Sequence, residues 1–276
     1  MGGVALRGTR TYLAVDASSV AAAEVVEGVK GQRLRTFAHE PLPAGVVTPG
    51  ATGPNLADQD AVRAATARVL GGVARGWVTL VLPDGVARLT LVEPPRGVLA
   101  CDYVRYRLAS SLPWPADEGV VDTLDAGSGR VVGAAVRRAT VAEYEQAASA
   151  AGAKDEQVNL APLLALAGLL RERRADEAHA LLGDVAMCLA FLSQGGILAL
   201  RSRRRDRSQG EASRLRAELL RLASRAANGH GSVPLLVSGS DAPRLRPDVG
   251  TSASGTVPVP AVSNGTEAGW LLGLVA

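Results

Sequence analysis

The sequence predicts a mixed α/β protein built as two lobes. A strand-rich segment near the N-terminus carries Asp16 at the end of its first strand, and a second strand-rich segment carries Asp184 in the corresponding place. Helical and further strand patterns follow each segment, so strands and helices are mixed in both halves. The chain has 276 residues, of which 47% are apolar, and this is enough to build a sizeable core in each lobe.

The first strand-rich segment predicts a meander followed by a helix. Short apolar or alternating patterns predict strands over 11–16, 20–29 and 32–40. A loop rich in Pro and Gly spans 41–54. The helix is predicted over 56–70, because Asp58 lies near its start and Gly71 lies just past its end.

The middle of the chain predicts a strand pair, a hairpin and three helices. Strands are predicted over 78–82 and 86–92 around a turn at 83–85, and over 120–125 and 130–136 around Gly127-Ser128-Gly129; helices are predicted over 99–111, 140–152 and 161–173. For the helix at 140–152, Thr140 is the expected N-cap, Glu143 completes a capping box, and Gly152 stops the helix.

The second half repeats the plan of the first. Strands are predicted over 178–185, 188–193 and 196–201, then a helix over 211–227, a buried strand over 233–237, a loop with a short strand over 250–260 and a closing helix over 267–275. The two halves show no detectable repeat of their residues. The repeated order of elements therefore carries the prediction of two lobes.

Several classes of function are disfavoured by composition. Cys101 and Cys188 stand in apolar settings and are expected to be buried, and no cysteine or histidine spacing predicts a zinc site. No signal peptide and no apolar run of membrane-spanning length is recognised, so a cytoplasmic location is expected.

Positive charge is concentrated in one segment, 201–207, which contains five arginines. The simplest interpretation is a solvated turn that leads into a helix. The alternative is contact with an anionic membrane surface. Stacking aromatic residues and a nucleic-acid-binding module are missing from this stretch of sequence, so no nucleic-acid partner is expected.

Three short motifs resemble those of the actin-like ATPase superfamily. Residues 12–20 are similar to its first phosphate hairpin, residues 183–188 to its second, and residues 235–242 to its adenosine loop. Between the hairpins, the segments 105–115, 121–124, 132–136, 143–152 and 159–163 follow the order seen in PilM and in the cytoplasmic part of the secretion protein GspL. The resemblance covers nearly the whole chain.

The resemblance implies an actin-like, ribonuclease H-like fold with a first lobe at 1–175, a small inserted α+β subdomain at about 83–160 and a reduced second lobe at 176–276. It also implies a cytoplasmic scaffold at the inner-membrane face of a type IV pilus or type II secretion platform. Its expected partner is the short cytoplasmic tail of a PilN-like membrane protein, held in a groove between about Leu82 and Pro162. A pilus or secretion ATPase is a further expected partner.

The resemblance also places a nucleotide site between the hairpins. The residues that match it are Asp16, Ser18, Ser19, Asp184, Gly239 and Ser240, and Asp16 and Asp184 would hold Mg²⁺ if Mg-ATP binds. Glycines of the family pattern are replaced by Ser18, Ala186 and Ser240, which adds side-chain atoms where backbone should approach phosphate.

These departures favour a degenerate cleft, with no cofactor or only weakly held ATP and Mg²⁺. No catalytic residue is assigned, and a protein that is not an enzyme is expected. Two alternatives stay open. The first is a small-molecule kinase or ATPase of the same superfamily, and the second is an unrelated α/β domain in which Asp16 and Asp184 merely cap turns after strands.

Overall fold

The first lobe is built on a five-stranded sheet with the strand order β3-β2-β1-β4-β8. Its strands are β1 (Thr9–Val15), β2 (Ser19–Gly28), β3 (Gly31–Pro41), β4 (Trp77–Leu82) and β8 (Lys154–Leu160). The computed structural model describes residues 8–28, 31–73, 77–171, 176–226, 233–239, 241–249, 261–262 and 266–267. Strands β1, β2 and β3 form an antiparallel meander, while β4 and β8 run parallel to β1.

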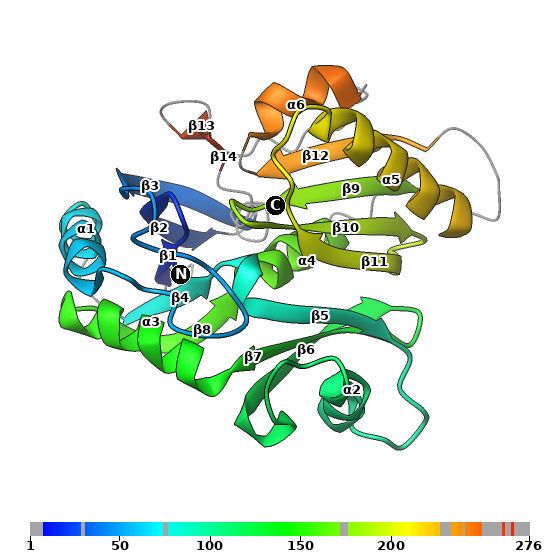
Figure 1. Cartoon of the computed structure of the whole chain (residues 1–276), viewed down its shortest axis with the longest axis horizontal. Coiled ribbons are helices and arrows are strands. Elements are labelled where there is room, and N and C mark those ends of the chain that lie inside the picture. The colour runs from blue at the N-terminus through cyan, green and yellow to red at the C-terminus, as the bar shows by residue number, and fades with distance from the viewer. Residues whose placement is uncertain are drawn as a thin grey trace, which may run out of the picture.

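Helices cover both faces of this sheet (Figure 1). On one face, α1 (Gln59–Gly71) and α3 (Arg138–Ala150) bury Val62, Val69 and Tyr144 against Leu13 and Leu80. On the other face, α4 (Ala161–Arg171) packs against the side chains that alternate with those. Because successive side chains of a strand point to opposite faces of the sheet, each strand presents apolar side chains to the helices on both faces.

A small subdomain is inserted after β4. It contains the short helix η1 (Asp84–Val86), then β5 (Ala87–Val92), α2 (Ala100–Ala109), the short helix η2 (Ala116–Glu118), β6 (Gly119–Gly127) and β7 (Arg130–Arg137). The three strands pair antiparallel in the order β5-β7-β6. Helix α2 packs on this sheet through Val104 and Leu108, and Gly133 lets Val104 approach the backbone closely.

The second lobe repeats the order of the first. Its sheet runs β11-β10-β9-β12, with β9 (Glu177–Leu182), β10 (Ala186–Ser193), β11 (Gly196–Arg204) and β12 (Leu235–Gly239). As in the first lobe, a meander of three strands is joined by a parallel strand on the far side of its first strand. Helices α5 (Glu211–Ala226) and α6 (Ala242–Val249) cover one face, and β13 (Ala261–Val262) pairs with β14 (Thr266–Glu267).

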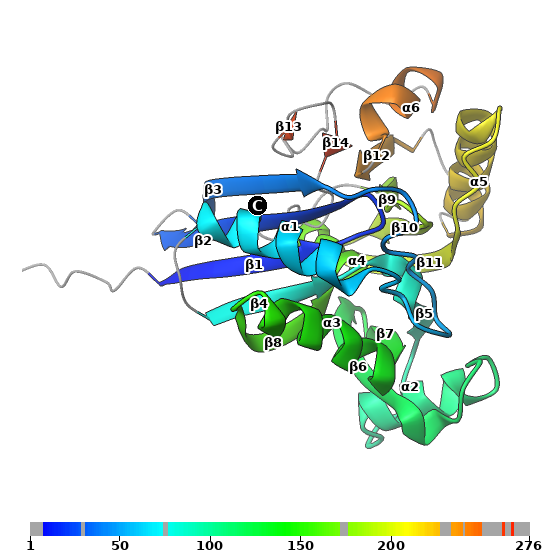
Figure 2. The ribbon, with the colours of Figure 1, turned by 60° about the vertical axis from the view of Figure 1, so that its left-hand side comes forward.

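A shared core joins the two lobes. Leu166 and Leu169 of α4, Val132 of the inserted subdomain, and Cys188 and Ile197 of the second sheet lie in one apolar cluster. The backbones of Gly127 and Gly196 also meet here, since a Cβ on Gly127 would lie 3.0 Å from the Cα of Gly196. Figure 2 shows β11 beside β5 at this junction.

Most predicted elements are present with small shifts of their ends, but the predicted capping box is wrong. Helix α3 begins at Arg138, its N-cap Arg137 makes no side-chain cap bond, and Thr140 is buried inside the helix. Glu143 instead accepts hydrogen bonds from the backbone N–H groups of Asn55 and Leu56, at 2.7–2.9 Å. It therefore ties the loop before α1 to α3.

Strands β8, β13 and β14, helix α6 and the short helices η1 and η2 were not predicted. The sequence of β8 is polar, as an edge strand allows, so it showed no strand pattern. The sequence of α6 contains Pro247 and charged residues, so it showed no helix pattern. The loop predicted over 250–260 lies outside the described residues, and so does the closing helix predicted over 267–275, apart from Glu267 at the end of β14. In the described part of the chain, helices are too short or too polar to cross a bilayer.

Candidate functional site

The two strand-end carboxylates predicted from the sequence lie in turns that meet between the lobes. Asp16 follows β1 and Asp184 follows β9, and the matching order of the two sheets brings both turns to the same place. The backbone N–H of Ser18 donates to Oδ2 of Asp184 at 2.9 Å, and the Ser18 hydroxyl donates to the same oxygen. Residues 166 positions apart are thus in direct contact.

Sequence reasoning missed a third carboxylate at this place. Asp84 lies at the start of η1, directly after β4, and only 6% of its surface is exposed. Its Oδ1 is buried with no hydrogen-bond partner. The carboxylate packs against Gly183, where a Cβ would lie 2.4 Å from that oxygen. The signal was present as Pro83-Asp84-Gly85, but it was interpreted only as a turn.

The closeness of these acids changes their proton affinity. Burial raises the pKa of Asp16 well above its ordinary value, and the neighbouring carboxylates of Asp184 and Asp84 raise it further. Burial, with the charge of Asp184 as the second cause, raises the pKa of Asp84 to about 6. Both acids therefore favour the protonated form more than an ordinary aspartate does.

Two arginines of the predicted basic run are built into the second-lobe side of the site. The side chain of Arg205 is fully buried, and it donates to Glu211 at 2.6 Å, to Asp241 at 3.0 Å and to the carbonyl of Gly183 at 2.9 Å. Arg207 donates to Oδ1 of Asp184 at 3.1 Å and lies 3.4 Å from Asp241. These contacts connect the hairpin at Asp184 with the start of α5 and the turn after β12.

The basic run is therefore not simply a solvated turn. Residues 201–204 belong to β11, and Arg203 pairs with Glu218 at 2.9 Å. With Arg205 and Arg207, three of its five arginines make ion pairs inside the protein. Arg201 and Arg204 are exposed.

The remaining predicted site residues have mainly backbone roles. The carbonyl of Ser19 accepts from the N–H of Asp16 at 2.9 Å, which closes the first turn. Gly239 has a φ of +103°, and a Cβ there would lie 2.1 Å from the carbonyl oxygen of Leu182. Glycine is thus required by the close approach of β12 to β9. Ser240 lies outside the described residues, and Ala186 begins β10.

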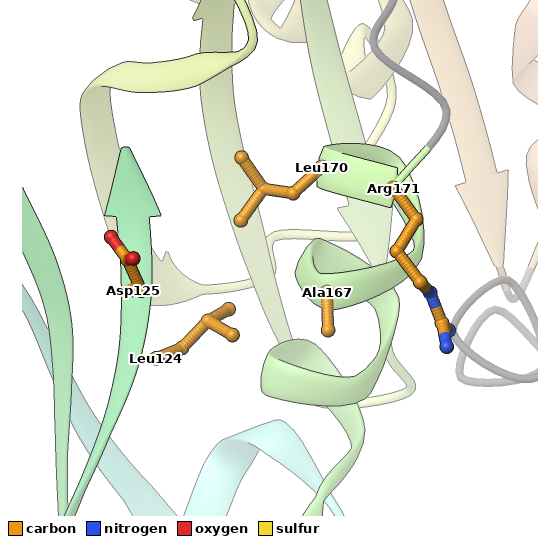
Figure 3. Close-up of a pocket in the computed structure, with 5 residues that line it drawn as sticks. All are labelled: Leu124, Asp125, Ala167, Leu170 and Arg171. Atoms are coloured by element: carbon orange, nitrogen blue, oxygen red, sulfur yellow. The ribbon is translucent and has the colours of Figure 1, made fainter. Parts of the chain in front are cut away.

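A groove lies beside the inserted subdomain, and it falls only partly within the range 82–162 predicted to hold a partner's tail, because its α4 side lies beyond Pro162. It has a volume of about 460 Å³ and lies between β6, which contributes Leu124 and Asp125, and α4, which contributes Ala167, Leu170 and Arg171. In Figure 3 the three apolar side chains lie between the carboxylate of Asp125 and the guanidinium of Arg171. The groove thus offers an apolar centre with opposite charges at its two sides.

The repeated sheets and the hairpins that meet between them define a protein with the actin-like ATPase fold, as the sequence predicted. A Bacteroides thetaiotaomicron protein described by that fold superposes with a TM-score of 0.56 and 9% identity, over 87% of this chain and 86% of its own.

Within that class, the chain is similar to PilM. It matches a chain of the PilM–PilN type IV pilus biogenesis complex with a TM-score of 0.64 and 20% identity, over 96% of this chain and 97% of the other. It also matches the cytoplasmic domain of EpsL, an inner-membrane component of the Vibrio cholerae type II secretion system, with a TM-score of 0.51 and 13% identity, over 83% and 82% of the two chains. The predicted resemblance is therefore confirmed at the level of the fold. No family model and no curated protein sequence matches the chain.

Proposed function

We propose that this protein is a cytoplasmic scaffold at the inner-membrane face of a type IV pilus or type II secretion platform, where it binds the cytoplasmic tail of a PilN-like membrane protein. The observation that carries the proposal is the agreement of fold with the PilM–PilN complex over 96% of the chain. The agreement includes the inserted subdomain, so the likeness extends beyond the sheets that all actin-like proteins share.

The proposal includes a degenerate nucleotide cleft, because the side chains there do not fit Mg-ATP. In a working cleft, the donors of the first hairpin would bind phosphate, but both donors of Ser18 are used on Asp184. A carboxylate that holds Mg²⁺ must face the metal or its water, but Oδ1 of Asp184 accepts from Arg207. Asp16 favours protonation, which further weakens a cation site.

No catalytic role follows from these residues. Phosphoryl transfer needs positioned phosphates and a group that orients the attacking nucleophile. Asp84 is a carboxylate in the cleft, but it is buried against Gly183 and faces the protein. We therefore propose that the protein holds partners and does not turn over nucleotide.

The groove between β6 and α4 is the proposed site for the tail. An extended or helical peptide would place apolar side chains over Leu124, Ala167 and Leu170. A basic residue of the peptide would pair with Asp125, and an acidic one would pair with Arg171. Such flanking charges fix the direction and register of a peptide more than they raise its affinity.

The test is a binding titration with fluorescent peptides that copy the N-terminal tails of single-span membrane proteins encoded beside this chain. We expect one tail to bind with micromolar affinity, and Arg171→Glu to weaken it by about tenfold. Arg216→Glu is the matched control, since it reverses an exposed arginine on α5, away from the groove. If no tail binds, or if both variants weaken binding equally, the proposed groove is wrong.

Calorimetry with Mg-ATP tests the second half of the proposal. We expect no saturable heat at ATP concentrations up to about 1 mM, where a typical enzyme site would be filled. Tight Mg-ATP binding accompanied by phosphate release or transfer to a small molecule would favour the kinase or ATPase alternative instead.

A further inference from the structure

We propose that Ser18, Asp184 and Arg207 form a latch that holds the two lobes together without a nucleotide. The inference rests on the degenerate cleft of the proposed function and concerns the regulation of that same cleft. The fold places these residues where phosphates and Mg²⁺ are expected, but their side chains bind one another instead.

The first step is the bonding of Asp184. Its Oδ2 accepts from the N–H and the hydroxyl of Ser18 in the first lobe, and its Oδ1 accepts from Arg207 in the second. Only 7% of the Asp184 side chain is exposed. A carboxylate enclosed to this degree needs such donors. Without these hydrogen bonds, the protein would bear the full free-energy cost of removing the carboxylate from water.

The second step is the need for donors from the first lobe. Asp184 lies near Asp16 and Asp84, and its charge is among the causes that raise the pKa of each. Bringing three carboxylates together is unfavourable unless cations or N–H and O–H groups offset the charge. Ser18 supplies this compensation from across the cleft, and Arg207 supplies it from the same side.

The third step is the anchoring of Arg207. Its guanidinium also lies 3.4 Å from Asp241, which in turn accepts from the buried Arg205. Arg205 is fixed by Glu211 at the start of α5. Arg207 is therefore held by a network that includes the turn after β12 and α5, and the latch connects the first hairpin to the body of the second lobe.

The fourth step is competition. Mg²⁺ or a phosphate entering between the hairpins must displace Arg207 from Asp184 or Ser18 from the same carboxylate. The latched arrangement makes the closed form the resting state of the protein, and its opening requires both lobes to exchange these bonds for water. This contrasts with a cleft that closes because a ligand is bound.

Hydrogen exchange followed by mass spectrometry tests the latch on the full chain. The peptides to follow cover residues 13–20 and 183–188, which contain the two hairpins. We expect Ser18→Ala and Arg207→Gln each to speed exchange in both peptides by about tenfold. The matched control is Arg214→Gln, since Arg214 pairs with Asp206 at 3.2 Å on the loop next to Arg207.

A peptide over 188–193 in the buried strand β10 separates local opening from general loss of stability, because its exchange should not change. The latch would be refuted if both hairpins of both variants exchanged at the same rates as in the unmodified protein. It would also be refuted if added Mg-ATP slowed exchange in the hairpins of the unmodified protein. Tail-peptide titration of the same variants keeps the two proposals apart. If the tail peptide binds but the exchange experiment contradicts the latch, the scaffold proposal still stands. If the exchange experiment supports the latch but no tail peptide binds, only the scaffold proposal is refuted.

Discussion

Gly183 packs directly against the carboxylate of Asp84, where the turn after β9 meets the end of β4. A Cβ at position 183 would lie 2.4 Å from Oδ1 and 2.6 Å from Oδ2 of Asp84. The backbone of Gly183 does not have a positive φ, so the close approach and not the turn conformation requires glycine here. The two lobes thus make contact where Gly183 of the second lobe, which has no side chain, packs against the buried carboxylate of Asp84.

The first prediction concerns this contact. We expect Gly183→Ala to lower the free energy of unfolding by about 1–3 kcal/mol, because the added methyl group overlaps the Asp84 carboxylate. The double variant with Asp84→Ala should recover most of that loss, as measured by urea denaturation in a double-mutant cycle. Gly71→Ala is the control, since a Cβ there meets nothing within 4 Å. Additive losses in the cycle would contradict the contact.

The second prediction concerns pH. The pKa of Asp84 is raised from 3.8 to about 6, so the folded state binds its proton more tightly than the unfolded state. The stability from protonated Asp84 is present below about pH 4 and is lost as the pH rises through about 6. This amounts to about 3 kcal/mol at pH 7. We expect Asp84→Asn, which stays neutral, to gain stability relative to the native chain over that interval.

The measurement is the difference in unfolding free energy between Asp84→Asn and the native protein from pH 4 to pH 8. The difference should grow in favour of the variant up to about pH 7 and then level off. Asp117→Asn, which changes an exposed acid in η2, is the control. A difference that stays flat with pH would show that Asp84 is ionised at no cost.

The third prediction concerns the buried ion pairs of Arg205. Replacing Arg205 with Met leaves the carbonyl of Gly183 without this donor, and it leaves buried Glu211 with its contact to Arg244 but without Arg205. We expect a loss of about 3–5 kcal/mol in unfolding free energy, as is usual when one partner of a buried pair is removed. Arg204→Gln, at the exposed neighbour, should change stability by no more than about 0.5 kcal/mol. Equal effects in the two denaturation curves would refute a structural role for Arg205.

The fourth prediction concerns membrane contact. Because Arg203, Arg205 and Arg207 pair with acidic side chains, we expect attraction of this run to anionic lipid to come mainly from the exposed Arg201 and Arg204. We expect Arg201→Ser with Arg204→Ser to weaken binding to phosphatidylserine vesicles by about thirtyfold, since each arginine near such a surface contributes about 1 kcal/mol. Vesicle co-sedimentation measures this. Unchanged binding, with neutral vesicles as the reference, would rule out this surface.

The sequence alone determined the order of elements, the two-lobed plan and the two strand-end acids, Asp16 and Asp184. These features depend on local patterns: apolar runs mark buried strands, glycines mark turns, and a carboxylate often follows a strand. Strand β8 was not predicted because an edge strand tolerates polar residues. The predicted capping box at Thr140 was wrong because Glu143 accepts hydrogen bonds from Asn55 and Leu56 instead.

Only the tertiary structure decided what the acids and arginines do. Whether Asp84 is a solvated turn residue or a buried third carboxylate depends on Gly183, and whether Arg205 is free or buried depends on Glu211 and Asp241. Likewise, the bond between Ser18 and Asp184 joins residues 166 positions apart. Such contacts form only where the two sheets pack together, and burial and charge pairing are properties of that packing.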